Sequence, residues 1–155
     1  MGDFEPLLKP ASFRFDYLRE YRSIGGIPQL VVDFRSLDPV AGNVLLGQAS
    51  VLVTVDSGSR VTMLPKRYAA PLRITLDERM KTTIPGAGGA KVPCYGRSWL
   101  EAQLCGQWVR LPVRFFAEEA RTGGLLGREG AFDALHLAFA HGRQLMYAAF
   151  AGGAT

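Results

Sequence analysis

The chain has 155 residues, which suits a single domain with a short extension. Its hydrophobic content of 48% excludes a disordered chain, and no apolar run is long enough to cross a bilayer, so no membrane segment is expected. The formal net charge of +4 comes from basic residues scattered along the sequence. A solubilising surface explains that charge more simply than a nucleic-acid interface, and no nucleic-acid partner is expected.

Residues 1–26 form the first expected unit, an N-terminal arm or extension that carries aromatic residues among charged ones. The arm ends at Gly25-Gly26, a glycine pair that interrupts regular structure. Its first residues are acidic and lack the apolar segment of a secretory signal, so we expect a cytoplasmic protein.

The second expected unit is one domain over residues 27–150, followed by a flexible tail at 151–155. The elements expected in its first half are strands at 27–34, 48–55 and 61–64, turns at 36–47 and 56–59, and a helical turn within 65–72. In the second of these strands Val51, Val53 and Val55 alternate with other residues and therefore share one face.

Residues 82–95 are expected to form a hairpin, because two extended arms flank the small residues Gly86, Ala87, Gly88 and Gly89. Glycine adopts positive φ angles easily, so the tip of this hairpin should open and close readily. The elements expected after it are strands at 99–104, 108–116, 137–139 and 145–150 and a short helix at 129–135. Many short strands with glycine-rich turns predict an all-β closed barrel with one short C-terminal helix.

Cys94 and Cys105 are the two cysteines, and they are expected to lie eleven positions apart on one extended stretch. Such a stretch separates them by roughly 36 Å, far beyond disulfide reach, so two reduced thiols are expected. The sequence has neither a Cys-x-x-Cys motif nor a histidine pair at ligand spacing, and a chemical role is not expected for His136 or His141. We therefore expect no zinc site.

Three short motifs carry the functional interpretation. The first, Asp56-Ser57-Gly58, follows the apolar strand that ends at Val55, and a carboxylate at the end of a buried strand is costly unless it has a use. Taken alone, Asp56 is explained as well by an Asx turn on the surface. The second motif is Ile84-Pro85-Gly86-Ala87-Gly88-Gly89, and the third is Leu125-Leu126-Gly127-Arg128.

In this order, the three motifs resemble the retropepsin-like family, the single-lobed, dimeric aspartic peptidases of retroviruses and their bacterial relatives. The resemblance covers residues 27–150 and implies a closed β-barrel of the acid-protease type. It implies that Asp56 is catalytic and that Ser57 and Gly58 complete the active-site turn. The flap that covers the substrate would contain Pro85, Gly86, Ala87, Gly88 and Gly89, and the segment that supports the turn would be Leu125, Leu126, Gly127 and Arg128.

The function that the resemblance implies is peptide-bond hydrolysis by a homodimeric aspartic endopeptidase acting on an extended peptide or protein substrate. Such an enzyme needs neither a metal nor an organic cofactor. The reaction needs an acid and a base, and one chain supplies one half-site. Two Asp56 carboxylates held about 3 Å apart cannot both ionise, so one keeps a proton while the other activates water. The alternative is a non-proteolytic dimerisation or peptide-binding module on the same fold. A weaker alternative is a nucleic-acid binder that uses the basic surface.

The sequence departs from the family at Arg60, where members often carry an acidic residue that pairs with the arginine after the second glycine. Because Arg60 and Arg128 cannot pair with each other, Arg128 is expected to contact Glu129 or Asp133. Ser57 replaces the commoner threonine, which keeps the hydroxyl group and loses the methyl group. Arg60 could instead favour acidic side chains in substrates. The long N-terminal arm and the loop at 36–47 make the chain more similar to the bacterial members than to the compact viral ones.

Overall fold

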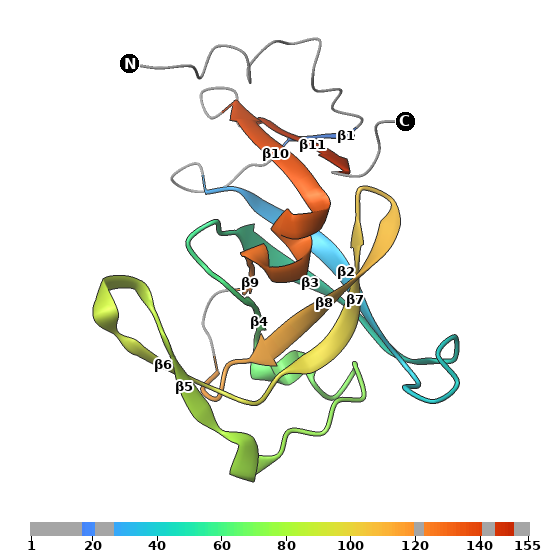
Figure 1. Ribbon diagram of the computed structural model, residues 1–155, viewed down its shortest axis with the longest axis vertical. Coiled ribbons are helices and arrows are strands. Elements are labelled where there is room, and N and C mark those ends of the chain that lie inside the picture. Colours follow the sequence, from blue (N-terminus) through green and yellow to red (C-terminus); the bar gives the residue numbers. More distant parts are fainter. Residues whose placement is uncertain (1–16, 21–26, 120–122, 141–144, 151–155) are drawn as a thin grey trace.

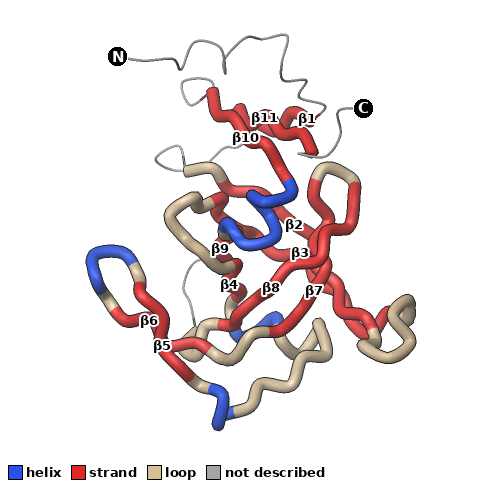
Figure 2. The backbone as a smooth tube through the Cα atoms, viewed as in Figure 1, coloured by secondary structure: helices blue, strands red, loops and turns tan. Residues whose placement is uncertain are grey.

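The computed structural model describes residues 17–20, 27–119, 123–140 and 145–150, most of them in β-strands (Figure 1, Figure 2). The strands are β1 (Tyr17–Glu20), β2 (Gln29–Leu37), β3 (Leu45–Val55), β4 (Thr62–Leu64), β5 (Thr82–Pro85), β6 (Lys91–Cys94), β7 (Ser98–Leu104), β8 (Gln107–Phe115), β9 (Gly124–Leu126), β10 (Leu135–Ala140) and β11 (Leu145–Phe150). The helical segments are η3 (Lys66–Tyr68), η4 (Glu78–Met80), η5 (Ala87–Gly89) and η6 (Arg128–Phe132). Within these described ranges, no helix has the length and apolar character needed to span a membrane.

Six strands close into a barrel in the order β2-β3-β9-β4-β8-β7. The barrel closes where β7 returns to β2, with Phe34 opposite Ala102 and Arg35 opposite Glu101. Two smaller sheets lie outside the barrel. One has the order β1-β11-β10 and lies above the barrel in Figure 1, and the other is the β5–β6 hairpin, which projects at the lower left.

Alternating apolar residues explain how the barrel strands form. In β3, Val51, Val53 and Val55 are buried while the residues between them face outward, as their spacing predicts. In β2, Val32 and Phe34 point into the same core. Further core residues from the other barrel strands are Leu64, Leu100, Ala102, Leu104, Leu111, Val113, Phe115 and Leu126. Removal of these side chains from water is the main force that holds the barrel together.

The short strand β9 fits between β3 and β4, the two strands that the Asp56 turn connects. It runs parallel to β3, with Val55 opposite Leu126, and antiparallel to β4, with Met63 opposite Leu125. Gly124 makes this close approach possible, because a Cβ atom there would lie 2.7 Å from the carbonyl oxygen of Met63. The fold therefore places residues 125–127 directly beside both ends of the turn.

Most of the predicted architecture is confirmed: the chain forms a closed barrel, and each expected strand is present within a few residues of its predicted bounds. The short helix expected at 129–135 is seen only as an irregular helical segment: η6 and the two α-helical residues after it cover positions 128–134, and β10 begins at Leu135. The physical reason lies in the backbone, since Glu129 is extended (ψ 121°) and Gly130 has a φ of +81°, neither of which continues a helix.

The single extended stretch expected to contain both cysteines is also wrong. Cys94 ends β6, and Cys105 lies in the turn between β7 and β8, with residues 95–97 connecting β6 to β7. Both thiols are nevertheless reduced, as expected. The arm at 1–26, apart from β1, and the tail at 151–155 lie outside the described residues.

Candidate active site

Asp56 lies at the end of β3, on a turn that is fixed by three hydrogen bonds. Its backbone N–H donates to the carbonyl oxygen of Leu126 at 3.0 Å, and its own carbonyl oxygen accepts from the N–H of Ser59 at 3.2 Å. The carboxylate atom Oδ1 accepts the N–H of Gly58 at 2.9 Å. The last bond is the Asx-type interaction expected of a surface turn, and it also holds one oxygen of the carboxylate in a defined position.

The second carboxylate oxygen of Asp56, Oδ2, accepts no hydrogen bond from the described residues. The side chain is half-buried, while Ser57 and Gly58 are exposed. A Cβ atom on Gly58 would lie 3.1 Å from Asp56 Oδ1, so a side chain there would press against the carboxylate. One oriented oxygen and one open oxygen leave Asp56 available to a group that approaches from outside the chain.

The third motif lies behind this turn, as expected. Leu126 is buried, and the N–H of Gly127 donates to the Oγ1 atom of the buried Thr62 at 3.1 Å. A Cβ atom on Gly127 would lie 2.5 Å from both the carbonyl carbon and the oxygen of Val61. Only glycine allows the two backbone segments to pass this close. Gly127 therefore determines how closely the segment after β9 packs against the Asp56 turn.

Arg60 forms an ion pair that sequence reasoning did not anticipate. Its Nε atom lies 2.8 Å from Glu129 Oε1, and Arg97 Nη2 lies 3.4 Å from Glu129 Oε2. The pairing expected between Arg128 and either Glu129 or Asp133 is wrong: within the described ranges, Glu129 pairs with these two arginines, and Asp133 Oδ2 accepts the N–H of Gly130. The extended backbone at Glu129 explains this outcome, because a regular helix there would direct its side chain differently.

The hairpin formed by β5 and β6 has the glycine-rich tip that the second motif predicts. The N–H of Gly86 donates to the carbonyl oxygen of Ala90 at 2.7 Å, which closes the tip over η5. Gly88 and Gly89 have φ angles of +68° and +80°, values that side chains resist. In Figure 1 this hairpin and the turn between β3 and β4 both lie on the left of the view. Among the described residues, no hydrogen bond or ion pair joins the two.

The base of the hairpin is anchored by Tyr95, which sequence reasoning missed. Its ring is buried, and its hydroxyl donates to Glu78 Oε1 at 2.7 Å. Lys81 Nζ lies 2.5 Å from Glu78 Oε2, so the carboxylate joins both stems of the hairpin. The hydrogen bond from Lys81, followed by that from Tyr95, lowers the pKa of Glu78 below its ordinary value of 4.5. The three-residue spacing between Glu78 and Lys81 was the available signal in the sequence.

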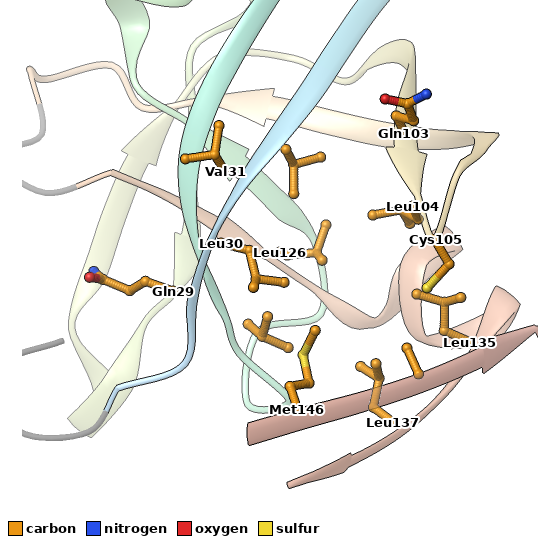
Figure 3. A pocket seen from close by; sticks show the side chains of 13 residues that line it. Gln29, Leu30, Val31, Gln103, Leu104, Cys105, Leu126, Leu135, Leu137 and Met146 are labelled. Atoms are coloured by element: carbon orange, nitrogen blue, oxygen red, sulfur yellow. The ribbon is translucent and has the colours of Figure 1, made fainter. Parts of the chain in front are cut away.

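A cavity of about 290 Å³ lies between the barrel and the β1-β11-β10 sheet (Figure 3). Its walls are mostly apolar, with Leu30 and Leu126 on the barrel side and Leu137 and Met146 on the sheet side. Asp56 does not contact this cavity, although its chain neighbour Val55 does. The cavity is therefore separate from the Asp56 carboxylate.

Other kinds of chemistry find little support in the part of the chain that the structure describes. It contains no group of three or more side chains placed to hold a metal ion. Burial raises the pKa of the Cys94 thiol, which keeps it protonated and a poor nucleophile. Asp56, with its oriented carboxylate on a buttressed turn, remains the strongest candidate.

Comparison of the chain with family models gave no match, and comparison with curated proteins gave none either. The three motifs and their positions in the fold are therefore the only indications of function in the described residues.

Proposed function

We propose that this protein is a retropepsin-like aspartic endopeptidase that works as a homodimer. The observation that carries the proposal is the placement of Asp56, at the end of a buried strand with one carboxylate oxygen held by Gly58 and the turn buttressed by Gly127. The closed barrel, the inserted strand β9 and the glycine-tipped hairpin support the same interpretation. A cytoplasmic location is part of the proposal.

The proposed chemistry requires two copies of the chain. Asp56 of one copy, ionised, takes a proton from a water molecule, and the water oxygen attacks the carbonyl carbon of the peptide bond. Asp56 of the other copy, protonated, donates its proton as the bond to the leaving nitrogen breaks. The pair shares one proton because two carboxylates this close cannot both be charged, so its titration belongs to the pair. Each hairpin closes over the substrate and excludes water.

The sheet β1-β11-β10 offers a route to the second copy. In its described part, β1 and β10 are edge strands, each hydrogen-bonded to β11 on one side only. Open strand edges pair readily with other strands. We propose that such pairing contributes to the dimer that brings the two Asp56 turns together.

The decisive experiment replaces the catalytic oxygen while keeping the size of the side chain. We expect Asp56→Asn to lower the cleavage of a denatured protein mixture by about 10²- to 10⁴-fold, because the pair loses its acid–base function. Liquid chromatography with mass spectrometry measures the released peptides. Circular dichroism and gel filtration should show an unchanged fold and dimer, and a statine-type inhibitor should block the wild-type protein.

Asp38→Asn is the matched control. Asp38 also caps a turn, accepting the N–H groups of Val40 and Ala41 through Oδ1, but it lies in the loop between β2 and β3. This variant should cleave like the wild type. Equal activity in Asp56→Asn and the wild type would remove the proposal. A wild-type protein that binds peptides but cleaves none would favour the non-proteolytic module instead.

A further inference from the structure

Two backbone hydrogen bonds hold the segment that leads from the Asp56 turn to Arg60. The carbonyl oxygens of Ser59 and Arg60 accept the N–H groups of Arg128 and Glu129, at 3.0 Å and 2.9 Å. These two bonds tie the end of the turn to the segment that follows Gly127. The Arg60 side chain therefore leaves from a well-defined point four residues beyond Asp56.

The Arg60 guanidinium group is held by one atom and otherwise open. Its Nε atom contacts Glu129 Oε1, and its side chain is 69% exposed. A guanidinium group has five N–H donors in a planar fork, and in the described residues the two terminal nitrogens of Arg60 have no ion-pair partner. Glu129 thus orients the group without occupying its outer edge.

The charge around this position is positive. Glu129 is shared between Arg60 and Arg97, so two cations surround one anion. Arg128, the chain neighbour of Glu129, is also exposed. Exposed ion pairs contribute little to stability, which leaves this arrangement without an evident structural purpose.

We propose that Arg60 and Arg97, oriented by Glu129, form a subsite that binds an aspartate or glutamate side chain of the peptide substrate. This inference rests on the proposed peptidase function and adds the substrate class. A carboxylate fits the planar edge of a guanidinium group with two parallel hydrogen bonds. Complementary charge also steers an acidic segment toward the turn and fixes its register.

The test compares paired synthetic peptides that differ only in one acidic residue and its uncharged amide, scanned through the positions around a cleaved bond. For the best position, we expect the wild-type kcat/KM to be about 10-fold higher for the acidic peptide. In Arg60→Gln this ratio should fall to about 1, and in Arg60→Lys, which keeps the charge but not the fork, it should be intermediate. The ratio is internal to each variant, so a general loss of activity does not disturb it.

Arg110→Gln is the matched control. Arg110 lies over the ring of Trp99 on the outer face of the barrel, at 5.0 Å from the ring centre, and its loss should leave the ratio unchanged. Added salt should lower the wild-type ratio, since the contact is exposed. A wild-type ratio of 1 at every position, or a ratio in Arg60→Gln equal to that of the wild type, would overturn the proposal.

Failure of the subsite and failure of the peptidase proposal give different results. The same paired peptides, carrying a fluorescent label, are titrated with wild-type protein, Asp56→Asn and Arg60→Gln, and binding is followed by fluorescence anisotropy. One outcome is that no peptide is cleaved, while wild type and Asp56→Asn bind the acidic peptide more tightly than its amide partner and Arg60→Gln does not. In that case the subsite stands and the catalytic proposal falls. Equal binding of both peptides to all three proteins contradicts the subsite whatever the cleavage assay shows.

Discussion

Gly127 shows how a single hydrogen atom in place of a side chain determines the geometry of the candidate site. The backbone of Val61 passes so close that a Cβ atom at position 127 would overlap it. The same residue donates its N–H to Thr62, a fully buried threonine in β4. Gly127 thus connects β4, the strand that follows the Asp56 turn, with β9, the strand that supports this turn.

Replacement of Gly127 with alanine should destabilise the fold by about 3 kcal/mol, because backbone atoms 2.5 Å from the new Cβ cannot move aside cheaply. The free energy of unfolding in urea measures this loss. Gly42→Ala is the control: Gly42 has a φ of +66° but nothing within 4 Å of its Cβ position, so only the backbone strain of about 1 kcal/mol is expected. Equal losses in the two variants would show that close packing is not what Gly127 provides.

At this scale, sequence reasoning succeeded where a motif is local. Asp56, Gly58 and Gly127 lie in short segments whose spacing predicts a turn and a close approach. It failed for Arg60 and Glu129, because which arginine a carboxylate meets depends on the backbone angle at one residue. The next residue, Gly130, packs against a distant strand, where a Cβ atom would lie 2.4 Å from Leu111 Cβ, and such a tertiary contact is not visible in the local sequence.

The β5–β6 hairpin is the element whose behaviour depends most on a few polar contacts. Its strands pair with each other through four residue pairs, Thr82–Cys94 to Pro85–Lys91. Its base is held by the contacts of Glu78 with Tyr95 and Lys81. A hairpin with a glycine-rich tip and a base held by polar contacts would be suited to opening and closing as a unit.

The contacts of Glu78 at the base of the β5–β6 hairpin should weaken in acid. The pKa of Glu78 is lower in the folded protein than its ordinary value of 4.5, so its ionised form stabilises the fold. This contribution is fully present above pH 4.5 and is lost as the pH falls through the lowered value. Amide hydrogen exchange of residues 82–94, corrected for the intrinsic rate at each pH, should therefore rise below pH 4.5. In Glu78→Gln, the exchange rate should already exceed that of the wild type at pH 6, and it should not rise further as the pH falls below 4.5. A step of wild-type size in that variant would assign the effect to another carboxylate.

At the scale of elements, the strands were predictable because alternation of apolar residues is strong and local. The hairpin was predictable because its glycines mark the tip. The irregularity of the short helix after Gly127 was not, because no local pattern signals the extended backbone at Glu129 that interrupts it. The insertion of β9 between β3 and β4 was also beyond sequence reasoning, because no local pattern specifies the strands beside it.

Each chain supplies one catalytic carboxylate, that of Asp56, and the proposed reaction needs two. The activity should therefore belong to pairs of chains. A fixed amount of wild-type protein mixed with an equal amount of Asp56→Asn should lose about half of its activity, because random exchange of subunits converts half of the wild-type chains into mixed dimers. The rate of peptide release measures this effect. Addition of Asp38→Asn instead should not inhibit. Undiminished activity in the first mixture would mean that a single chain cleaves by itself.

At the scale of the whole molecule, the closed barrel could be predicted from the sequence. The position of a second copy could not, because no pattern within one chain specifies a contact between two copies.

The position of β9 has a consequence for the order in which the protein matures. The turn that bears Asp56 is translated some seventy residues before β9, the strand that supports it, a separation typical of slow, non-local contacts. Until β9 has been synthesised and has paired with β3 and β4, a nascent chain carries Asp56 on an unsupported loop. Any proteolytic activity would therefore arise only after that pairing, which protects the polypeptide and its neighbours up to that point.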